Sequence, residues 1–201
     1  MDLLSFFLAQ HADSHAAALT GADEPQFSDQ VLAGMTGAQL RLRPAPGLNS
    51  IAWLLWHIAR CEDVAIRVLL TDCGQILDEG NWLPQLGITQ RDMGTGMDAA
   101  GVTTISARLD IGATIAYRNA VGRRTREAVS GLSGPAWEGP IEPERLLEAD
   151  AFPNHADGMR RVATYWRDKT RSYLLTSSIA THNYQHLGEA TVIKGLIGRM
   201  G

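Results

Sequence analysis

Two histidines four residues apart near the end of the chain are the residues best suited to metal chemistry. His182 and His186 lie in THNYQHLGEA, residues 181–190, which has no proline and a single glycine. Residues at this spacing share one face of an α-helix, with Cβ atoms about 6 Å apart, so both imidazoles can reach a common point. Neutral imidazole is the commonest protein ligand of zinc and also binds nickel, copper and iron. The pair alone is a weak signal, because such pairs also occur on exposed helices.

A third histidine, His57, lies in the most apolar stretch of the chain, WLLWHIA. An unpartnered imidazole buried there costs free energy, so His57 is expected to have a hydrogen-bond partner or a metal ion. If His57 meets the pair, three imidazoles leave at least one coordination position for water or substrate. That arrangement is typical of catalytic rather than structural metal sites, and bound zinc brings the pKa of water to about 7.

Other ionisable side chains near the histidines have several interpretations. Glu189 shares the helix face of His182 and His186, so it would orient a histidine, act as a general base, or pair with a neighbouring helix. Cys61 shares the face of His57 and can approach a metal, but such a cysteine is more often a small core residue. Glu62 and Asp63 lie off that face and are expected to pair with arginines.

The remaining candidates carry weaker signals. Asn183, Tyr184 and Trp82 can line a pocket, but the sequence does not decide whether they do. Cys73 has no evident partner. Three further histidines have no motif around them and are interpreted as surface or structural residues: His11, His15 and His155.

The elements that must position these residues are expected to be helices. Apolar periodicity predicts four main helices, over residues 1–20, 48–70, 103–132 and 159–198, the last with a break near 169–172. Asn49 or Ser50 is the expected cap of the second, and Ser28 of a shorter helix that follows Pro25.

Two long connections join the predicted helices. Residues 72–102 lose all periodicity but keep apolar side chains, which favours a packed loop or a lid. Residues 133–158 form a second irregular stretch, with a short helix expected after Pro143. Since no alternating run is long enough for a strand, the chain is predicted to be all-α: a four-helix bundle with long connections, forming one domain over residues 1–201.

The stretches PGLNSIAWLLWHIARCED, residues 46–63, and THNYQHLGEA resemble the DinB-like superfamily, a group of bacterial metal-binding four-helix bundles. Members carry one histidine on the second helix and an H-x-x-x-H pair on the last, often followed after one residue by Gly-Gln or Gly-Glu. His57, His182 and His186 match these positions, and HLGE matches the tail of the motif. The resemblance implies a three-histidine site for a divalent ion, commonly zinc or nickel, and an up-down-down-up helix order.

The resemblance also implies a reaction class. Characterised relatives include transferases and isomerases that use low-molecular-weight thiols such as mycothiol or bacillithiol, in which the metal would present a thiolate to an electrophilic substrate. Metal-dependent hydrolysis is the alternative within the enzymes. A metal-binding or stress-response module without turnover is the alternative outside them. Neither substrate nor metal identity follows from the sequence.

Composition narrows the partners and the compartment. The 201 residues, 45% hydrophobic and 20% charged, suit one soluble domain. A net charge of -4 argues against nucleic acid or an anionic membrane as partner. The densest basic cluster, Arg118 to Arg126, is interpreted as a solvated helix face. The start lacks the charge of a signal peptide, no segment reaches membrane-spanning length, and two cysteines make no disulfide framework. We therefore expect a cytoplasmic protein acting on a small molecule or thiol, with a homo-oligomer left open.

Overall fold

Helices make up the architecture of the computed structural model, which describes residues 2–70, 74–132, 134–147 and 156–199. Within those ranges no β-strand occurs, and one isolated bridge joins Pro140 to Thr170. The prediction of an all-α fold is confirmed. The up-down-down-up order of a four-helix bundle and the extent of the domain stay predictions. No helix among these residues has both the length and the apolar character needed to cross a membrane.

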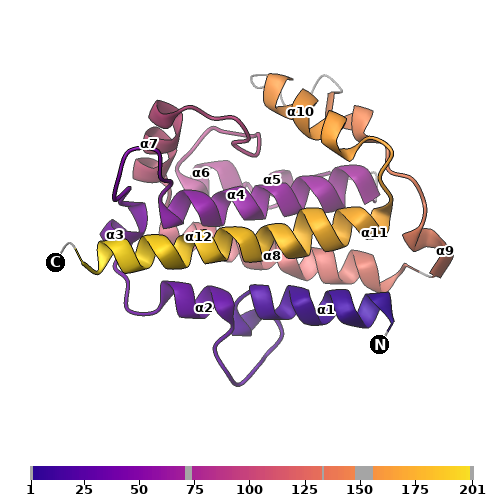
Figure 1. Ribbon diagram of the computed structural model, residues 1–201, viewed down its shortest axis with the longest axis horizontal. Coiled ribbons are helices and arrows are strands. Elements are labelled where there is room, and N and C mark those ends of the chain that lie inside the picture. Colours follow the sequence, from indigo (N-terminus) through magenta and orange to yellow (C-terminus); the bar gives the residue numbers. More distant parts are fainter. Residues whose placement is uncertain (1, 71–73, 133, 148–155, 200–201) are drawn as a thin grey trace.

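Long helical segments lie side by side in Figure 1. They are α1 (Leu3–Ser14) followed by α2 (Phe27–Leu32), α4 (Ile51–Val64), α8 (Ile111–Ser130), and α12 (His182–Ile197). The α4 helix contacts both α8 and α12, and α1 contacts the same two helices from the other side. Shorter elements surround them: η1 (Ala17–Leu19), α3 (Gly37–Arg41), α7 (Ala99–Arg108), α9 (Gly134–Trp137), a 3-10 helix (Pro143–Leu147) and α10 (Ala156–Trp166).

The α4 helix forms the centre of the molecule. All of its residues are buried, as expected from a sequence that is apolar almost all round. Ser50, one of the two predicted caps, begins the helix: its Oγ accepts a hydrogen bond from the backbone N–H of Trp53 at 3.0 Å. The helical path continues to Leu70, but from Ala65 onward it is π-helical rather than α-helical.

The predicted single helix over residues 103–132 is wrong. The chain forms α7 and α8 with a break at Leu109 and Asp110, and the Asp110 carboxylate caps α8 by accepting from the Ala113 N–H at 2.8 Å. An aspartate before an apolar run is a recognised start signal, so this break was detectable. The predicted Ser28 cap is also wrong. Helix α2 begins after Gln26, whose N–H donates to Asp29 at 3.0 Å.

The last predicted helix is broken close to the expected place. After α10, the chain restarts at Thr170, which caps α11 (Arg171–Tyr173). A π-helical segment, Leu174–Thr181, then leads into α12. Because π-helical turns shift side chains around the helix axis and are frequent at functional sites, this segment helps set the direction of the histidines that follow.

The first long connection is a packed loop, as predicted, over its described residues 74–102. It contains α5 (Ile76–Glu79) and α6 (Trp82–Leu86), and Ile76, Leu77 and Leu86 are buried in the core. Cys73 lies outside the described residues, as does His155 in the second connection. Whether the loop acts as a lid stays a prediction.

Candidate metal centre

The three histidines singled out by spacing meet in the fold. His57 comes from α4, and His182 and His186 from the first turns of α12. One ring nitrogen from each lies within 4.8 Å of the others, and the ring centroids are 4.5 to 5.1 Å apart. The two Nε2 atoms of the pair are 3.1 Å apart. Such a separation suits two ligands of one ion with metal–nitrogen distances of about 2.0–2.1 Å.

Hydrogen bonds fix the tautomers of two of these imidazoles. The Nδ1–H of His57 donates to the backbone carbonyl of Met93 at 2.5 Å, and that of His186 donates to Glu189 Oε2 at 2.9 Å. A carbonyl and a carboxylate only accept here, so both rings carry their proton on Nδ1 and keep the Nε2 lone pair free. This pattern of an outer acceptor on the far ring nitrogen accompanies most metal-bound histidines. The donor set therefore fits a divalent ion of the zinc and nickel type.

Burial keeps the imidazoles of His57 and His182 neutral. Loss of hydration lowers the pKa of His57 to about 4, although the Met93 carbonyl acts in the opposite direction. Loss of hydration and the other two histidines lower the pKa of His182 to about 3. The pKa of the Glu189 carboxyl is lowered mainly by its hydrogen bond from His186, so it is ionised. At neutral pH the cluster is ready to bind a cation without first releasing protons from these two rings.

The loop after α6 holds His57 in place, which sequence reasoning missed. Its Gly94 has a φ of +76°, and a Cβ there would come within 2.8 Å of the indoles of Trp53 and Trp56. Trp53 in turn stacks on the His57 ring at 4.7 Å. A glycine is thus required for the close approach that brings the Met93 carbonyl to His57.

A buried arginine anchors the same loop. Arg60 is fully buried and donates to the backbone carbonyls of Arg91 and Asp92. Its other partners include Asp63, at 2.8 Å, so the expected pairing of Asp63 with an arginine is confirmed. Both Arg60 and His57 donate to backbone carbonyls of this loop. Any residue type has such a carbonyl, so the sequence could not predict these contacts.

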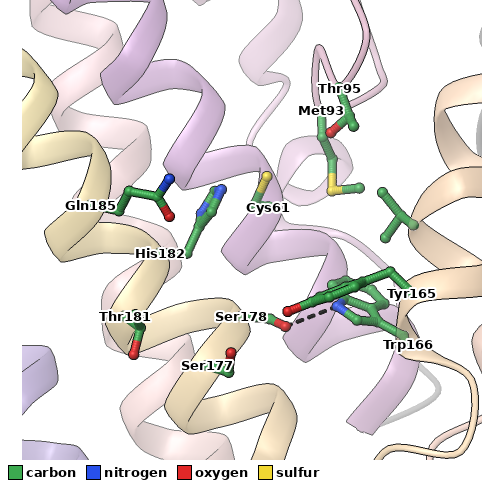
Figure 2. A pocket seen from close by; sticks show the side chains of 11 residues that line it. Cys61, Met93, Thr95, Tyr165, Trp166, Ser177, Ser178, Thr181, His182 and Gln185 are labelled. Carbon is green, nitrogen blue, oxygen red and sulfur yellow. Dashed lines mark hydrogen bonds between the residues drawn. The ribbon is translucent and has the colours of Figure 1, made fainter.

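A pocket of about 250 Å³ opens beside the cluster (Figure 2). His182 forms part of its wall, together with Cys61 and Met93. The remaining lining residues are all uncharged. Those with a hydroxyl group are Thr95, Tyr165, Ser177, Ser178 and Thr181, and the others are Val162, Trp166 and Gln185. The chain therefore places a neutral, partly polar cavity next to the cluster, where it meets the ring of His182.

Cys61 lines this pocket as a thiol. Its Sγ lies 3.8 Å from both ring nitrogens of His57, and burial raises its pKa to about 12. The side chain also packs in the core with Val64 and Ile179. The interpretation of Cys61 as a small core residue agrees with this environment, because a protonated thiol is a poor metal ligand.

The three residues considered for a pocket wall do not line this pocket. Tyr184 donates to Asp13 at 2.5 Å, and Trp82 packs against the ring of Tyr117. Asn183 is buried and donates to Glu62 Oε2 at 3.2 Å. The side chain of Asn183 therefore contacts a different cluster from that of its neighbour His182.

That second cluster corrects one expectation and decides between the two alternatives left for His11 and His15. Glu62 does not pair with an arginine; its carboxylate contacts His11 Nε2 at 2.8 Å and His15 Nε2 at 3.1 Å. Both histidines are fully buried, so they are structural rather than surface residues. The basic cluster is also not a uniformly solvated face, because Arg118 is buried and donates to the Ser14 carbonyl at 2.9 Å.

Comparisons with known proteins agree with the fold and identify a family. A family model described as the DinB superfamily matches residues 23–190, a range that contains His57, His182 and His186. A solved structure, described as the conserved protein of a locus from Enterococcus faecalis, is 19% identical, with 99% of each chain covered and a TM-score of 0.69. At this identity the likeness shows the fold alone. No curated protein matches the chain.

Proposed function

This chain belongs to the DinB superfamily, and we propose that it is a metal-dependent enzyme acting through His57, His182 and His186. The proposed reaction transfers a low-molecular-weight thiol of the mycothiol or bacillithiol type to an electrophilic substrate, or uses such a thiol in an isomerisation. The observation that carries the proposal is the pocket: the three imidazoles converge, and one of them, that of His182, lines the wall of a cavity. Catalytic metal sites keep such an open position, whereas structural sites close it.

The protein residues prepare the site in three ways. Met93 and Glu189 hold the Nδ1 protons, so the Nε2 lone pairs face the shared centre. Asn49 donates to Glu189 Oε1 at 2.9 Å and keeps that carboxylate in position. Trp53 stacks on His57 and keeps water away from one face of its ring. A divalent ion bound here would supply Lewis acidity that lowers the pKa of an approaching thiol.

The pocket suits an uncharged, hydroxyl-bearing part of the ligand. Among its lining residues there is no Lys, Arg, Asp or Glu, while Ser177, Ser178 and Thr181 offer hydroxyl groups along one wall. In the proposed transfer the thiol gives its proton to solvent. Its sulfur then forms a bond to the electrophilic carbon of the substrate as the bond to the leaving group breaks, and that group departs with the electron pair.

Hydrolysis is the second candidate, favoured by the ionised carboxylate of Glu189 beside the cluster. A metal-dependent hydrolase commonly uses such a group as general base on water. Here, however, Glu189 contacts His186 and Asn49 and does not line the pocket. We therefore rank hydrolysis below thiol transfer, with Glu189 as a positioning residue.

Metal exchange in the folded protein tests the proposal. Wild type is dialysed against a chelator, reconstituted with zinc or nickel, and compared with His57→Ala by mass spectrometry of metals. We expect close to one exchangeable equivalent in wild type and its loss in the variant, while both remain folded. If wild type takes up no exchangeable metal after reconstitution, the proposal is wrong.

A thiol screen tests the reaction class. Reconstituted wild type is assayed with bacillithiol, mycothiol, glutathione and cysteine against a chromogenic electrophile. Glu189→Gln and His57→Ala serve as variants. Turnover that depends on the metal and on His57 supports transfer. If thiols give no turnover but activated esters do, hydrolysis replaces it. If no substrate turns over and chelation unfolds the protein, the cluster is a structural metal site.

A further inference from the structure

The carboxylate of Glu62 is a buried charge with no cationic side chain against it. Its exposure is 2%, and it accepts hydrogen bonds from His11, His15, Thr125 and Asn183. Across the described parts of the chain, no lysine or arginine forms an ion pair with it. Burial of an ionised carboxylate is costly unless a cation compensates its charge. A positive ion bound directly to the carboxylate would supply the compensating charge that no ion pair with a lysine or arginine supplies.

The donor atoms are arranged as ligands of one ion. One atom from each of His11, His15 and Glu62 lies within 4.8 Å of the other two. The two carboxylate oxygens face different rings, with Oε1 2.8 Å from His11 Nε2 and Oε2 3.1 Å from His15 Nε2. The centroids of the two imidazole rings are 4.2 Å apart. Two imidazole nitrogens and a bidentate carboxylate give four donor atoms, the usual number for structural zinc.

No other polar contact satisfies the two rings. The Nδ1 atoms of His11 and His15 are buried without a hydrogen-bond partner. Within the described residues, the Glu62 carboxylate is therefore the polar partner of both imidazoles, and both rings turn their Nε2 atoms toward it. Outer acceptors of the kind that Met93 and Glu189 provide at the open cluster do not contact these two rings.

We propose that His11, His15 and Glu62 form a second metal site, which holds a divalent ion of the zinc class in a closed, non-catalytic position. Thr125 donates to Glu62 Oε1 at 2.6 Å and Asn183 to Oε2 at 3.2 Å, and these bonds orient the carboxylate from outside. The charge of the buried Arg118 also interacts with Glu62, but its guanidinium donates to the Ser14 carbonyl and the Ser28 hydroxyl and forms no ion pair with the carboxylate.

The site would tie together the helices of the molecule. His11 belongs to α1 and His15 follows its last residue, whereas Glu62, Thr125 and Asn183 belong to α4, α8 and α12. All three proposed ligands are buried, so an ion has no solvent path in the folded state. It must enter while the chain folds, and it should leave only when the helices separate.

The test is to load the full-length protein during folding. Wild type is unfolded in denaturant with EDTA, refolded with or without zinc chloride, and then treated with EDTA in the folded state. We expect one equivalent to resist EDTA after refolding with zinc, in addition to the exchangeable one. The double variant His57→Ala/His182→Ala should keep this resistant equivalent. It therefore distinguishes zinc bound at the buried cluster from zinc bound at the open one.

Two further measurements keep the proposal falsifiable. Glu62→Gln, and separately His11→Gln, should lose the resistant equivalent and keep the exchangeable one. Because these variants risk misfolding, anomalous diffraction at the zinc edge on wild-type crystals serves as a second measurement and should show a peak between the three side chains. Wild type that binds one equivalent in total, with no such peak, would overturn the proposal. The cluster would then be a metal-free hydrogen-bond network around the Glu62 carboxylate.

Discussion

The molecule contains two histidine clusters made to nearly the same plan and placed in opposite environments. Each joins two histidines four residues apart to one residue of α4, namely His57 in the first cluster and Glu62 in the second. The first stands beside a pocket, whereas the second is sealed between helices with fully buried imidazoles. The spacing of the histidines is therefore not enough to determine whether a cluster is open to a pocket. The side chains that pack around the cluster determine it.

The packing around the closed cluster explains why it has no cavity. A Cβ on Gly122 of α8 would lie 2.7 Å from the ring of His15, so only glycine lets the two elements approach this closely. Beside the open cluster there is a pocket instead, lined by hydroxyl-bearing residues and by Met93 of the loop after α6. The predictions that follow test whether this contrast controls stability and metal binding.

The largest expected effect is on stability, at Glu62. In metal-free protein, Glu62→Gln should lower the free energy of unfolding by about 3 kcal/mol, because a single amide oxygen cannot accept the four buried hydrogen bonds that the carboxylate accepts. Glu189→Gln is the matched control at the open cluster. That carboxylate is partly exposed and accepts two hydrogen bonds, so its loss should cost about 1 kcal/mol. Denaturant unfolding measures both, and equal losses would remove the distinction between the clusters.

Acidification should act on both clusters. An unfolded histidine has a pKa near 6.5, whereas the folded values are about 4 for His57 and about 3 for His182 and His15. As the pH falls from 7 to 5, the unfolded state takes up protons first, so the metal-free protein loses stability, by about 2 kcal/mol for each such histidine. Urea unfolding at both pH values measures the loss.

Variants divide this pH effect between the clusters. His182→Gln and His15→Gln should each flatten the pH dependence, and His182→Gln should do so less because water reaches that ring. A wild-type stability that is unchanged between pH 7 and 5 would contradict the low folded pKa values in both places.

A smaller effect is expected for metal affinity at the open cluster. Glu189→Gln should weaken exchangeable zinc binding by about tenfold, since outer carboxylates commonly contribute ten- to a hundredfold. Asn49→Ala, which removes only the support of Glu189, should weaken it less. Competition with a chromophoric chelator measures both affinities. If Glu189→Gln leaves the affinity unchanged, Glu189 does not position His186.

The smallest effect is expected at Cys61. Burial raises the pKa of Cys61 to about 12 in the metal-free protein, and the side chain packs in an apolar cluster, so we expect it to stay a core thiol outside the ligand set. Cys61→Ala should change zinc affinity by less than about threefold. Cobalt-substituted wild type should lack a thiolate-to-metal charge-transfer band, and such a band would place Cys61 among the ligands of the open site.

The parts of this structure that local spacing controls were predictable. Helical periodicity placed His182 and His186 on one face, and Ser50 was among the expected caps of α4. The break between α7 and α8 was missed although Asp110 carries a standard capping signal, since the apolar periodicity runs through it.

The parts that depend on distant contacts were not predictable. Glu62 lies off the His57 face, so its partners could be known only after α1 was packed against α4. The Met93 carbonyl is a backbone atom supplied by a loop without periodicity. The pattern of residue types describes one helix or loop at a time. It does not show which backbone groups of a distant segment will contact that element.

Met93 contacts both the metal cluster and the pocket. Its carbonyl accepts a hydrogen bond from His57, and its side chain lines the pocket. A ligand that binds better when this loop is in place also favours the imidazole orientation that binds metal. Thermodynamic linkage then requires reciprocity: if metal binding strengthens occupancy of the pocket by some factor, occupancy of the pocket strengthens metal binding by the same factor. Metal affinity measured with the pocket empty is therefore a lower bound on the affinity during turnover.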